Sequence, residues 1–396
     1  MTAPRDRLVA ADLPELLRTV LAALAVAREE VDDLNVFPVP DGDTGTNLHA
    51  TVQAAVQAVD ELPPGSEPGE VARVAARGAL RGAAGNSGVI FSQVVRAFAE
   101  YLGTGAVGTA EVRPLLERAR DLAYEAVAEP VPGTILSALD AAVDGARALE
   151  PGVDLAVAMA LVIESVGDAV AASRDVLEAN RHAGVVDAGA RGLEVALEGV
   201  LAHVERRTYE AVPPPPVRRT HGEVVTRESG DLTYGHEVQY LLEADDDVAP
   251  ALRSRLEELG DSVVVVACGG LLNVHVHTND VDGAVAAGAE HGEPSRVVVT
   301  AFADQIAARH ATDAPDGPTP AVGYLTVLPG RGLVDLARAM GAVVVDGAAG
   351  MLPTVATVLN AVGDVDADEV VLLPGHPNVV PTMHQASDVS VAEGGR

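Results

Sequence analysis

The chain has 396 residues, a length that predicts two or three domains, and 48% of them are hydrophobic, which is enough to fill several cores. Lys plus Arg total 27 against 58 Asp plus Glu, so the formal net charge is −31, and all 27 basic residues are Arg. Without Lys the chain cannot form a Walker A loop, the lysine site of a protein kinase or a Schiff base. So acidic a protein is expected to repel nucleic acid and anionic membranes.

The single cysteine, Cys268, excludes internal disulfides and all-cysteine metal sites. The first residues lack a continuous apolar signal core, and no run of about 18 uninterrupted apolar residues follows them. We therefore expect a cytoplasmic protein with no membrane insertion and no nucleic-acid partner.

Apolar residues recur at helical spacing through residues 1–210, which predicts an all-α domain. The expected helices cover residues 8–32, 46–60, 69–83, 87–102, 109–128, 134–149, 154–173 and 189–206. Their apolar residues are mostly Ala and Val, so the helices should pack closely. Two connections, residues 35–47 and 180–192, are rich in Gly, Asp and Asn and longer than a bundle needs, so we expect functional loops there.

Four consecutive prolines, Pro213–Pro216, mark residues 211–222 as a stiff linker that few contacts should cross. Residues 223–312 predict an α+β middle domain, in which two strands flank Cys268 as a hairpin. Its expected strands are 233–244, 262–267, 271–278 and 295–301, and its expected helices are 248–259 and 281–290. After a second linker at 314–321, residues 321–396 alternate strand and helix. This predicts a partial parallel α/β domain, truncated or atypically short.

Residues 35–47, with the sequence NVFPVPDGDTGTN, carry the strongest chemical signal. Asp41 and Asp43 flank Gly42, where a turn can direct both carboxylates to one point, and such a pair favours a hard cation between them. Mg²⁺ held by carboxylates and phosphate oxygens is the usual arrangement in nucleotide sites. The alternative is an Asx-type turn that only caps the next helix. The prolines and the following Thr-Gly-Thr-Asn favour a metal–phosphate site.

Weaker signals come from three other helix starts. They are Ser87 in the Gly-rich stretch RGAAGNSG, Thr134, and Asp187 in the 180–192 loop. The N–H groups at a helix start, with the Ser87 hydroxyl, could hold a phosphate. Thr134 is favoured as a simple helix cap unless the loops converge. Near Asp187, Arg181 and Arg191 could supply the positive charge that Lys provides elsewhere.

These segments together closely resemble a known family. The stretches NVFPVPDGDTGTN, GAAGNSGVIFSQ, PVPGTILSAL and AGVVDAGARGLEVALEG are similar to the nucleotide-binding domain of the dihydroxyacetone kinase family, and most similar to the catalytic subunit of bacterial fatty acid kinase. The resemblance covers nearly the whole chain. It implies a multidomain fold: an all-α eight-helix barrel, an α+β middle domain and a partial, degradation-V-like α/β C-terminal domain. It also implies ATP and Mg²⁺ as cofactors and phosphorylation of a fatty acid, delivered by a lipid-binding carrier protein, to an acyl phosphate.

Carried over residue by residue, the resemblance implies Mg²⁺ ligands at Asp41 and Asp43, with Asn35 in place of a further Asp of dihydroxyacetone kinases. We assign catalytic roles to Asp41, Asp43 and Arg181, and we expect a homodimer. The predicted nucleotide contacts are Thr44, Thr46, Asn47, Gly85, Asn86, Ser87, Thr134 and Asp187.

His275 and His277 alternate on a predicted strand, so both rings should project from the same face, which suits Zn²⁺. The related kinases have a zinc site of one Cys and two His in this domain. Here Glu237 stands at the position of that Cys, and Cys268 lies elsewhere. The hypothesis is a Zn²⁺ site of Glu237, His275 and His277; the alternative is a pair of polar strand residues that face a groove. Cys268 is expected to be an inert turn residue.

Two other functions stay open on the sequence. The first is a dihydroxyacetone- or glycerone-type kinase subunit, which must activate a neutral hydroxyl; the substrate-binding domain with its covalent His is not recognisable in this chain. The second is a non-catalytic nucleotide-binding regulatory protein, against which the retained Asp41 and Asp43 count.

Overall fold

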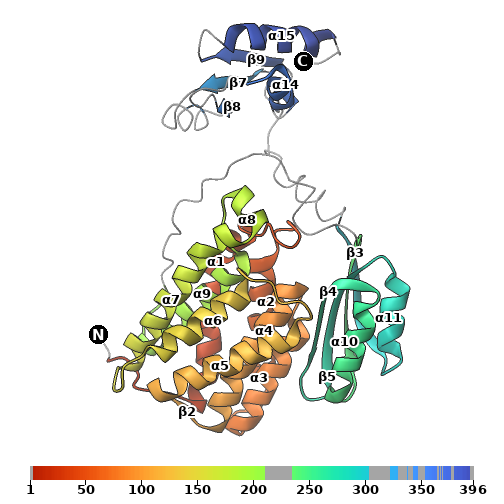
Figure 1. The fold of residues 1–396 in the computed structure, drawn as a ribbon. Coiled ribbons are helices and arrows are strands. Elements are labelled where there is room, and N and C mark those ends of the chain that lie inside the picture. Colours follow the sequence, from red (N-terminus) through yellow and green to blue (C-terminus); the bar gives the residue numbers. More distant parts are fainter. Residues whose placement is uncertain are drawn as a thin grey trace. The chain divides into compact units, whose positions relative to one another are not determined.

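The computed structural model describes residues 3–209 and 234–302, and residues 322–392 apart from 329–336, 338–341, 347–352, 364, 366, 368 and 376–378. The chain divides into two compact units, Met1–Thr312 and Asp313–Arg396 (Figure 1). Both predicted linkers, residues 211–222 and 314–321, lie outside the described residues.

The first part of the first unit is helical, as predicted. Its helices are α1 (Leu13–Asp33), α2 (Thr44–Asp60), α3 (Pro68–Gly82), α4 (Gly85–Thr104), α5 (Thr109–Ala126), α6 (Ile135–Arg147), α7 (Leu155–Val176), the short α8 (Glu178–Ala183) and α9 (Ala188–Glu205). Each of α1 to α6 packs against the next helix, and α9 packs against both α7 and α1, so the contacts form a closed cycle. This order is compatible with the predicted barrel, which stays a prediction.

Two local predictions in this domain are wrong. Residues 8–12, expected to begin the first helix, form strand β1 (Leu8–Val9) and a 3-10 turn, and β1 pairs antiparallel with β2 (Ala106–Val107). The helix begins later because Pro14 occupies its first turn, the helical position that proline tolerates. The 180–192 loop is shorter than expected, because α8 occupies its first residues and ends at Gly184, whose φ of 72° favours glycine.

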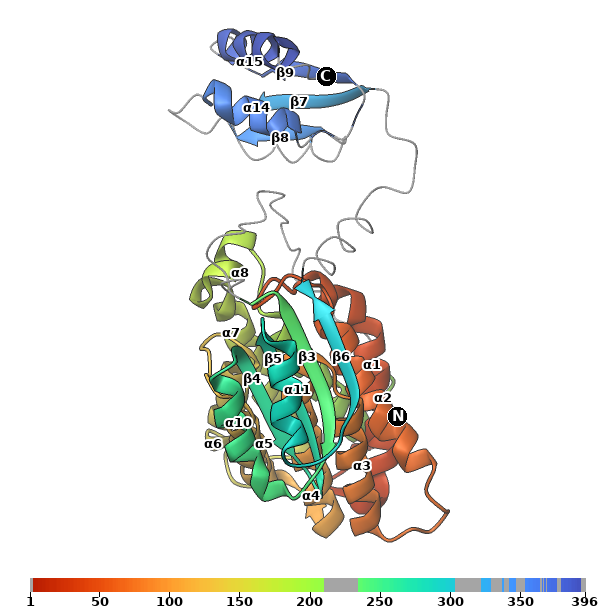
Figure 2. The same ribbon diagram turned by 90° about the vertical axis from the view of Figure 1, so that its right-hand side faces the viewer.

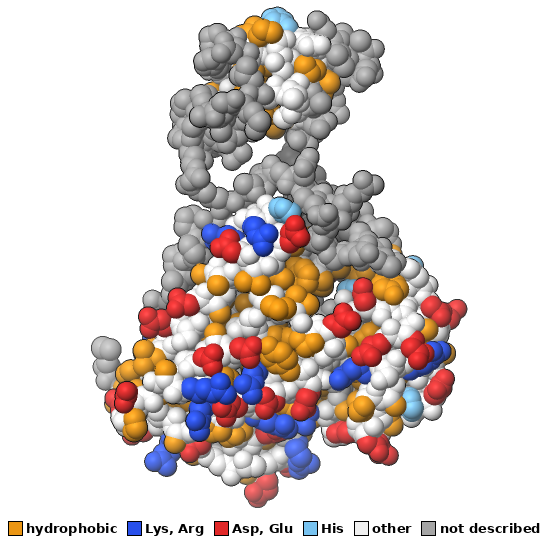
Figure 3. Space-filling model, in the orientation of Figure 1, with side chains coloured by type: hydrophobic (Ala, Val, Ile, Leu, Met, Phe, Trp, Pro, Cys, Tyr) orange, Lys and Arg blue, Asp and Glu red, His pale blue; other side chains and the backbone are white. Residues whose placement is uncertain are grey.

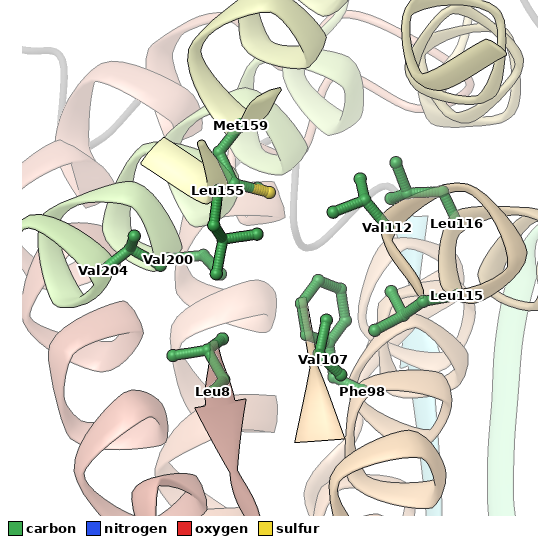
Figure 4. Close-up of a pocket in the computed structure, with 10 residues that line it drawn as sticks. All are labelled: Leu8, Phe98, Val107, Val112, Leu115, Leu116, Leu155, Met159, Val200 and Val204. Atoms are coloured by element: carbon green, nitrogen blue, oxygen red, sulfur yellow. The ribbon is translucent and has the colours of Figure 1, made fainter. Parts of the chain in front are cut away.

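The helical core is filled by Ala, Val and Leu, in line with the composition. Within it, a cavity leaves about 10 Å³ for the centre of a water molecule, which is room for roughly one water. Its lining, shown in Figure 4, is entirely apolar and consists of Leu8, Phe98, Val107, Val112, Leu115, Leu116, Leu155, Met159, Val200 and Val204. It is too small for an organic ligand.

Helix α7 is long and apolar enough, by length and composition alone, to cross a membrane. It packs against α6 and α9, and its Val162 and Val166 are fully buried in the helical core. The helix therefore has a packing role inside the first unit. The cytoplasmic location and the lack of membrane insertion stay predictions.

The middle domain is a four-stranded sheet in the order β4-β5-β3-β6, with antiparallel neighbours throughout. Its strands are β3 (His236–Glu243), β4 (Gly260–Ala267), β5 (Leu271–Thr278) and β6 (Pro294–Ala301). Strands β4 and β5 form the predicted hairpin. Helices α10 (Ala249–Glu257) and α11 (Val281–Ala289) cover one face of the sheet, as Figure 2 shows, and pack on alternate strand residues such as Val238, Tyr240 and Val274.

The opposite face of this sheet packs on the helical domain. All eight residues of β5 are buried, as in a strand covered on both faces. Val264 and Val266 of β4 form a cluster with Leu80 at the end of α3 and Val89 in α4. The expectation that few contacts cross between these two domains is therefore wrong. The polyproline linker joins two bodies that share a buried apolar surface.

The second unit is a small parallel α/β domain, as predicted. Strand β7 (Val322–Leu328) lies between β8 (Val343–Asp346) and β9 (Glu369–Pro374) and is parallel to both. Helices α14 (Val355–Gly363) and α15 (Val380–Ala392) contribute Val358 and Met383 to its core.

Candidate functional site

The loop between α1 and α2 is closed by Asn35. This side chain is 3% exposed; its Nδ2 donates to the carbonyl oxygen of Val39 at 2.7 Å, and its Oδ1 accepts from the N–H of Thr44 at 3.2 Å and from the Thr44 hydroxyl. Both acceptor directions of the Asn35 oxygen are thus used. The structure gives Asn35 and Thr44 a role in closing the loop, and metal binding by the Asn35 oxygen would require one of these bonds to break. The nucleotide contact of Thr44 stays a prediction.

The start of α2 is held against the end of α1. The N–H and the hydroxyl of Thr46 donate to the carboxylate of Asp32 at 2.9 and 2.8 Å. At Gly45 a β-carbon would lie 2.3 Å from the carbonyl oxygen of Arg28, so only glycine permits this approach. Thr46, predicted to contact phosphate, is exposed and bound to Asp32 instead. Figure 1 shows this loop and α8 at the same end of the helical domain.

Asp41 and Asp43 lie close to Glu237 of β3, so the acidic site is built by two domains. Burial is the largest cause that raises the pKa of Asp41; the charges of Asp43 and Glu237 and a hydrogen bond to Asp43 act in the same direction, and together they bring this pKa to about 8. Burial and the charge of Asp43 raise the pKa of Glu237 to about 7. Asp43 occupies the N-cap of α2 but makes no side-chain capping bond. These groups therefore form a like-charge cluster, the situation that a bound cation relieves.

Helix α4 begins directly beside the start of α2. Asn47 is buried, and a β-carbon on Gly85 would lie 2.6 Å from its Nδ2. Gly85 has a φ of 59°, so this close approach and its backbone shape both require glycine. The structure thus brings Asn47 and Gly85 together, with Asn86 and Ser87 next in the chain. The Oδ1 of Asn86 is buried and lacks a hydrogen-bond partner among the described residues.

Thr134 and Asp187 cap two helices that start side by side. Thr134 accepts from the N–H of Leu136 at 3.4 Å and so caps α6. Asp187 accepts from the N–H of Ala190 at 2.7 Å and also from backbone groups of Gly189 and Ile135. Because Ile135 follows Thr134, the two loops converge. Burial raises the pKa of Asp187 to about 7. Nucleotide contacts by these two residues stay predictions.

The arginines of the 180–192 segment are engaged elsewhere. Arg191 is buried and pairs with Glu30 and Glu194 at 2.8 Å each and with Glu198 at 3.6 Å, so its charge is neutralised and its predicted role as a free positive charge is wrong. Arg181 is exposed on α8 and donates to the carbonyl oxygen of Asp175 at 2.8 Å. Its catalytic role stays a prediction.

Strand β5 directs His275 and His277 from the same face, toward the helical domain, with ring centroids 5.1 Å apart. His275 is 1% exposed, and its Nδ1 lies 3.4 Å from Oε1 of Glu237. Among the described residues neither ring nitrogen of His275 has a hydrogen-bond partner. Burial lowers the pKa of both rings, that of His277 to about 4, so both are neutral near pH 7. Neutral imidazoles are the form that binds metal.

These groups do not yet form a closed metal site. The Nδ1 of His277 lies 3.6 Å from Oδ1 of Asp261, and its ring packs edge-on against Phe302. Within the described parts of the chain, no three His, Cys, Asp or Glu side chains are arranged to hold a metal ion. The Zn²⁺ site at Glu237, His275 and His277 stays a hypothesis.

Three family models match successive parts of the chain: the DAK2 domain over residues 38–202, the middle domain of FakA-like fatty acid kinase proteins over 233–309, and their C-terminal domain over 323–393. Protein YloV of Bacillus subtilis is 32% identical over 382 residues, which cover 91% of this chain and 68% of that protein. The chain belongs to the FakA-like family.

Other matches are weaker. An uncharacterized protein of Staphylococcus epidermidis is 29% identical over 393 residues, covering 92% of this FakA-like chain and 69% of that protein. The crystal structure of the dihydroxyacetone kinase from C. freundii, in complex with AMP-PNP and Mg²⁺, is 19% identical with a TM-score of 0.37. The match covers 48% of this chain and 33% of that one.

Sequence reasoning missed three residues that shape the site of this FakA-like protein: Asp32, Gln239 and Asn273. Asp32 is an acid in the last turn of α1, where the helix dipole disfavours negative charge. An acid at such a position indicates that its carboxylate has a specific partner, so this residue could have been found from the sequence. Gln239 follows Glu237 by two positions on β3, and Asn273 precedes His275 by two positions on β5. Polar residues at alternate positions of an otherwise apolar strand indicate a face that meets another polar surface.

Proposed function

We propose that the protein transfers the γ-phosphoryl group of ATP, in the presence of Mg²⁺, to the carboxylate of a fatty acid presented by a lipid-binding partner, giving an acyl phosphate. The observation that carries this proposal is that α2 and α4 begin side by side next to Asp41 and Asp43. Helix starts offer N–H groups to phosphate, and an acidic pair favours a cation. The matches of the middle and C-terminal domains to FakA-like fatty acid kinase proteins support the choice of acceptor.

Asp41 and Asp43 fit Mg²⁺ because they are neighbouring carboxyl groups. Burial and the charge of Asp43 raise the pKa of Asp41 to about 8, so Asp41 holds a proton at neutral pH, which a bound cation would replace. Glu237 is close enough to share in that charge balance. Asn35 fits less well, since Thr44 uses its amide oxygen. When bound, Mg²⁺ would neutralise phosphate charge and orient the phosphates for in-line transfer.

The chain's own groups would hold the phosphates at the start of α4. The first N–H groups of a helix have no intrahelical acceptor, and the side chains of Asn86 and Ser87 lie in that turn. A protein with a net charge of −31 otherwise repels ATP, so backbone donors and the metal must supply the attraction. Backbone N–H groups and the metal together would allow a site without Lys to bind a polyphosphate.

A carboxylate acceptor suits this site, because a fatty acid is ionised near pH 7 and needs no strong general base. Catalysis then depends on positioning the acceptor and on charge neutralisation. The apolar cavity of the helical core, about 10 Å³, is far too small for an acyl chain, so the chain of the acid would be held outside this core. A lipid-binding carrier meets that need, and we include it and a homodimeric assembly in the proposal.

The test measures ATP consumption and acyl phosphate formation with a lipid-loaded carrier, with and without Mg²⁺. Asp43→Asn should lower turnover by about 100-fold or more, because it removes a charged ligand but keeps the shape of the side chain. Asp168→Asn, at an exposed position of α7, is the matched control and should leave turnover unchanged.

Other outcomes would point to other functions. Phosphorylation of dihydroxyacetone in place of the carrier-bound acid would favour the glycerone-type kinase. Binding of Mg·ATP without turnover under any acceptor would favour the regulatory protein. Undiminished turnover by Asp43→Asn would contradict the assignment of the metal site.

A further inference from the structure

The turn between α3 and α4 is capped by a side chain of the middle domain. α3 ends at Gly82, α4 begins at Gly85, and the intervening N-cap residue Ala84 makes no side-chain capping bond. Instead, Oε1 of Gln239 on β3 accepts from the N–H of Gly85 at 3.3 Å, and its Nε2 donates to the carbonyl oxygen of Ala83 at 2.7 Å. One amide therefore satisfies the end of one helix and the start of the next.

Asn273 on β5 completes this cap. Its Nδ2 donates to the carbonyl oxygens of Leu80 at 2.9 Å and Ala83 at 3.1 Å, and its Oδ1 accepts from Nε2 of Gln239 at 3.2 Å. Asn273 is fully buried. If its amide were removed, these backbone carbonyls would lose partners in a place where water does not readily replace them.

The register of the sheet explains why these two amides meet. Strands β3 and β5 are antiparallel, with Gln239 opposite His275 and Leu241 opposite Asn273. Gln239 and Asn273 are therefore diagonal neighbours on one face of the sheet. Glu237 and His275 share this face, which is the one that packs on the helical domain. The same face thus supplies both the carboxylate near Asp41 and the cap of the α3–α4 turn.

We infer that Gln239 and Asn273 are positioning residues of the nucleotide site, which hold the first turn of α4 in the orientation that phosphate binding requires. This inference rests on the proposed function, in which Asn86 and Ser87 lie beside the phosphates. Because Gln239 occupies the N–H of Gly85, the donors left for phosphate are those of the following residues. A shift of the turn at residues 83–84 would displace these N–H groups directly. The middle domain is therefore a structural part of the nucleotide site.

The experiment uses the full chain and compares Gln239→Met and Asn273→Leu, which remove the amides and keep most of the volume. Arg253→Met is the control: Arg253 donates across the same interface to the carbonyl oxygen of Glu125, and none of its hydrogen bonds within the described residues goes to residues 80–88. The readouts are the melting temperature, amide hydrogen exchange of residues 84–88 without ligand, and the Kd for Mg·ATP by calorimetry.

Gln239→Met and Asn273→Leu should speed exchange at residues 84–88 and raise the Kd for Mg·ATP about tenfold, the effect of losing one or two hydrogen bonds that position a site. Arg253→Met should lower the melting temperature without either change. Equal effects of all variants on Kd, or unchanged exchange at 84–88, would overturn the inference. Should the parent fail to bind Mg·ATP, the proposed function fails, and the exchange data alone still decide whether the amides hold the turn.

Discussion

Asp187, which is buried, and Asp41 and Glu237, which are half-buried, have raised pKa values for different reasons, and these reasons distinguish their roles. The pKa of Asp187 rises to about 7 through burial alone, against three backbone hydrogen bonds that lower it. For Asp41 and Glu237, neighbouring carboxylates add to burial. A lone buried acid that receives N–H groups is a helix cap, whereas a cluster of acids favours a cation.

Asp187→Asn should remove a pH dependence of stability. Because the folded-state pKa of Asp187 lies above its ordinary value of 3.8, the folded protein holds its proton more tightly, and stability falls as pH rises from 3.8 to about 7. The slope from this one group is at most about 1.4 kcal/mol per pH unit. Asn can still cap α9, so the stability of the variant relative to the parent should increase as pH rises. Melting temperatures of both proteins from pH 5 to 8 measure this difference. A constant difference across this range would contradict the assignment.

At the scale of helices, small residues set the distance between α2 and α3. A β-carbon at Gly82 would lie 2.2 Å from the β-carbon of Ala54, and one at Gly78 would lie 2.6 Å from that of Ala58. Neither neighbour can rotate away, because a β-carbon is fixed to the backbone. The Ala-rich composition thus predicted the close packing correctly.

Gly82→Ala should destabilise the protein by about 1–3 kcal/mol, since it overpacks the α2–α3 contact. Gly69→Ala in the same helix is the control: its nearest foreign atom is 4.0 Å away, so the change should be neutral or slightly stabilising. Urea unfolding of both variants measures the difference. Equal stabilities would show that α3 can move away from α2 without cost.

At the scale of strands, β3 and β5 present Glu237, His275 and His277 on the face that meets the helical domain. If these residues bind Zn²⁺, protein purified without a His tag should contain about one Zn²⁺ per chain, or acquire it on titration. The double variant His275→Ala with His277→Ala should lose it, whereas His291→Ala, at an exposed position, should not. Equal zinc binding by parent and double variant would leave the histidines as polar interface residues.

Helices and strands with a clear pattern of apolar residues could be predicted from the sequence, whereas features that depend on tertiary contacts could not. The strand expected at 271–278 matches β5, because its run of apolar and β-branched residues ends at turn residues on both sides. Helix α8 was missed because its sequence, EANRHA, is short and polar and lies within a segment whose glycines and acids suggest a loop. The acidic pair was evident in the sequence, but the approach of Glu237 to it depends on how two domains pack.

For the whole molecule, surface charge and buried contacts have separate functions. Figure 3 shows acidic side chains over both the helical and the middle domain, with Arg side chains among them. Such exposed pairs, for example Arg147 with Asp144 at 3.1 Å, contribute little to stability. Contacts that join the two domains include the apolar cluster around Leu80 and Val264, the amides of Gln239 and Asn273, and the hydrogen bond from Arg253 to Glu125.

That arrangement predicts the behaviour of a chain cut before the middle domain. Residues 1–209 alone would expose Leu80, Val89 and Ala126 and would return the α3–α4 turn to water. We expect the melting temperature to fall by about 10 °C relative to residues 1–312, since several kcal/mol of burial and hydrogen bonding are lost. Residues 1–312 should melt in one cooperative transition, because both domains belong to one compact unit. Scanning calorimetry of the two chains makes the comparison. An unchanged melting temperature for residues 1–209, or two separate transitions for residues 1–312, would show that the middle domain does not stabilise the helical domain. In that case the two chains should bind Mg·ATP equally well.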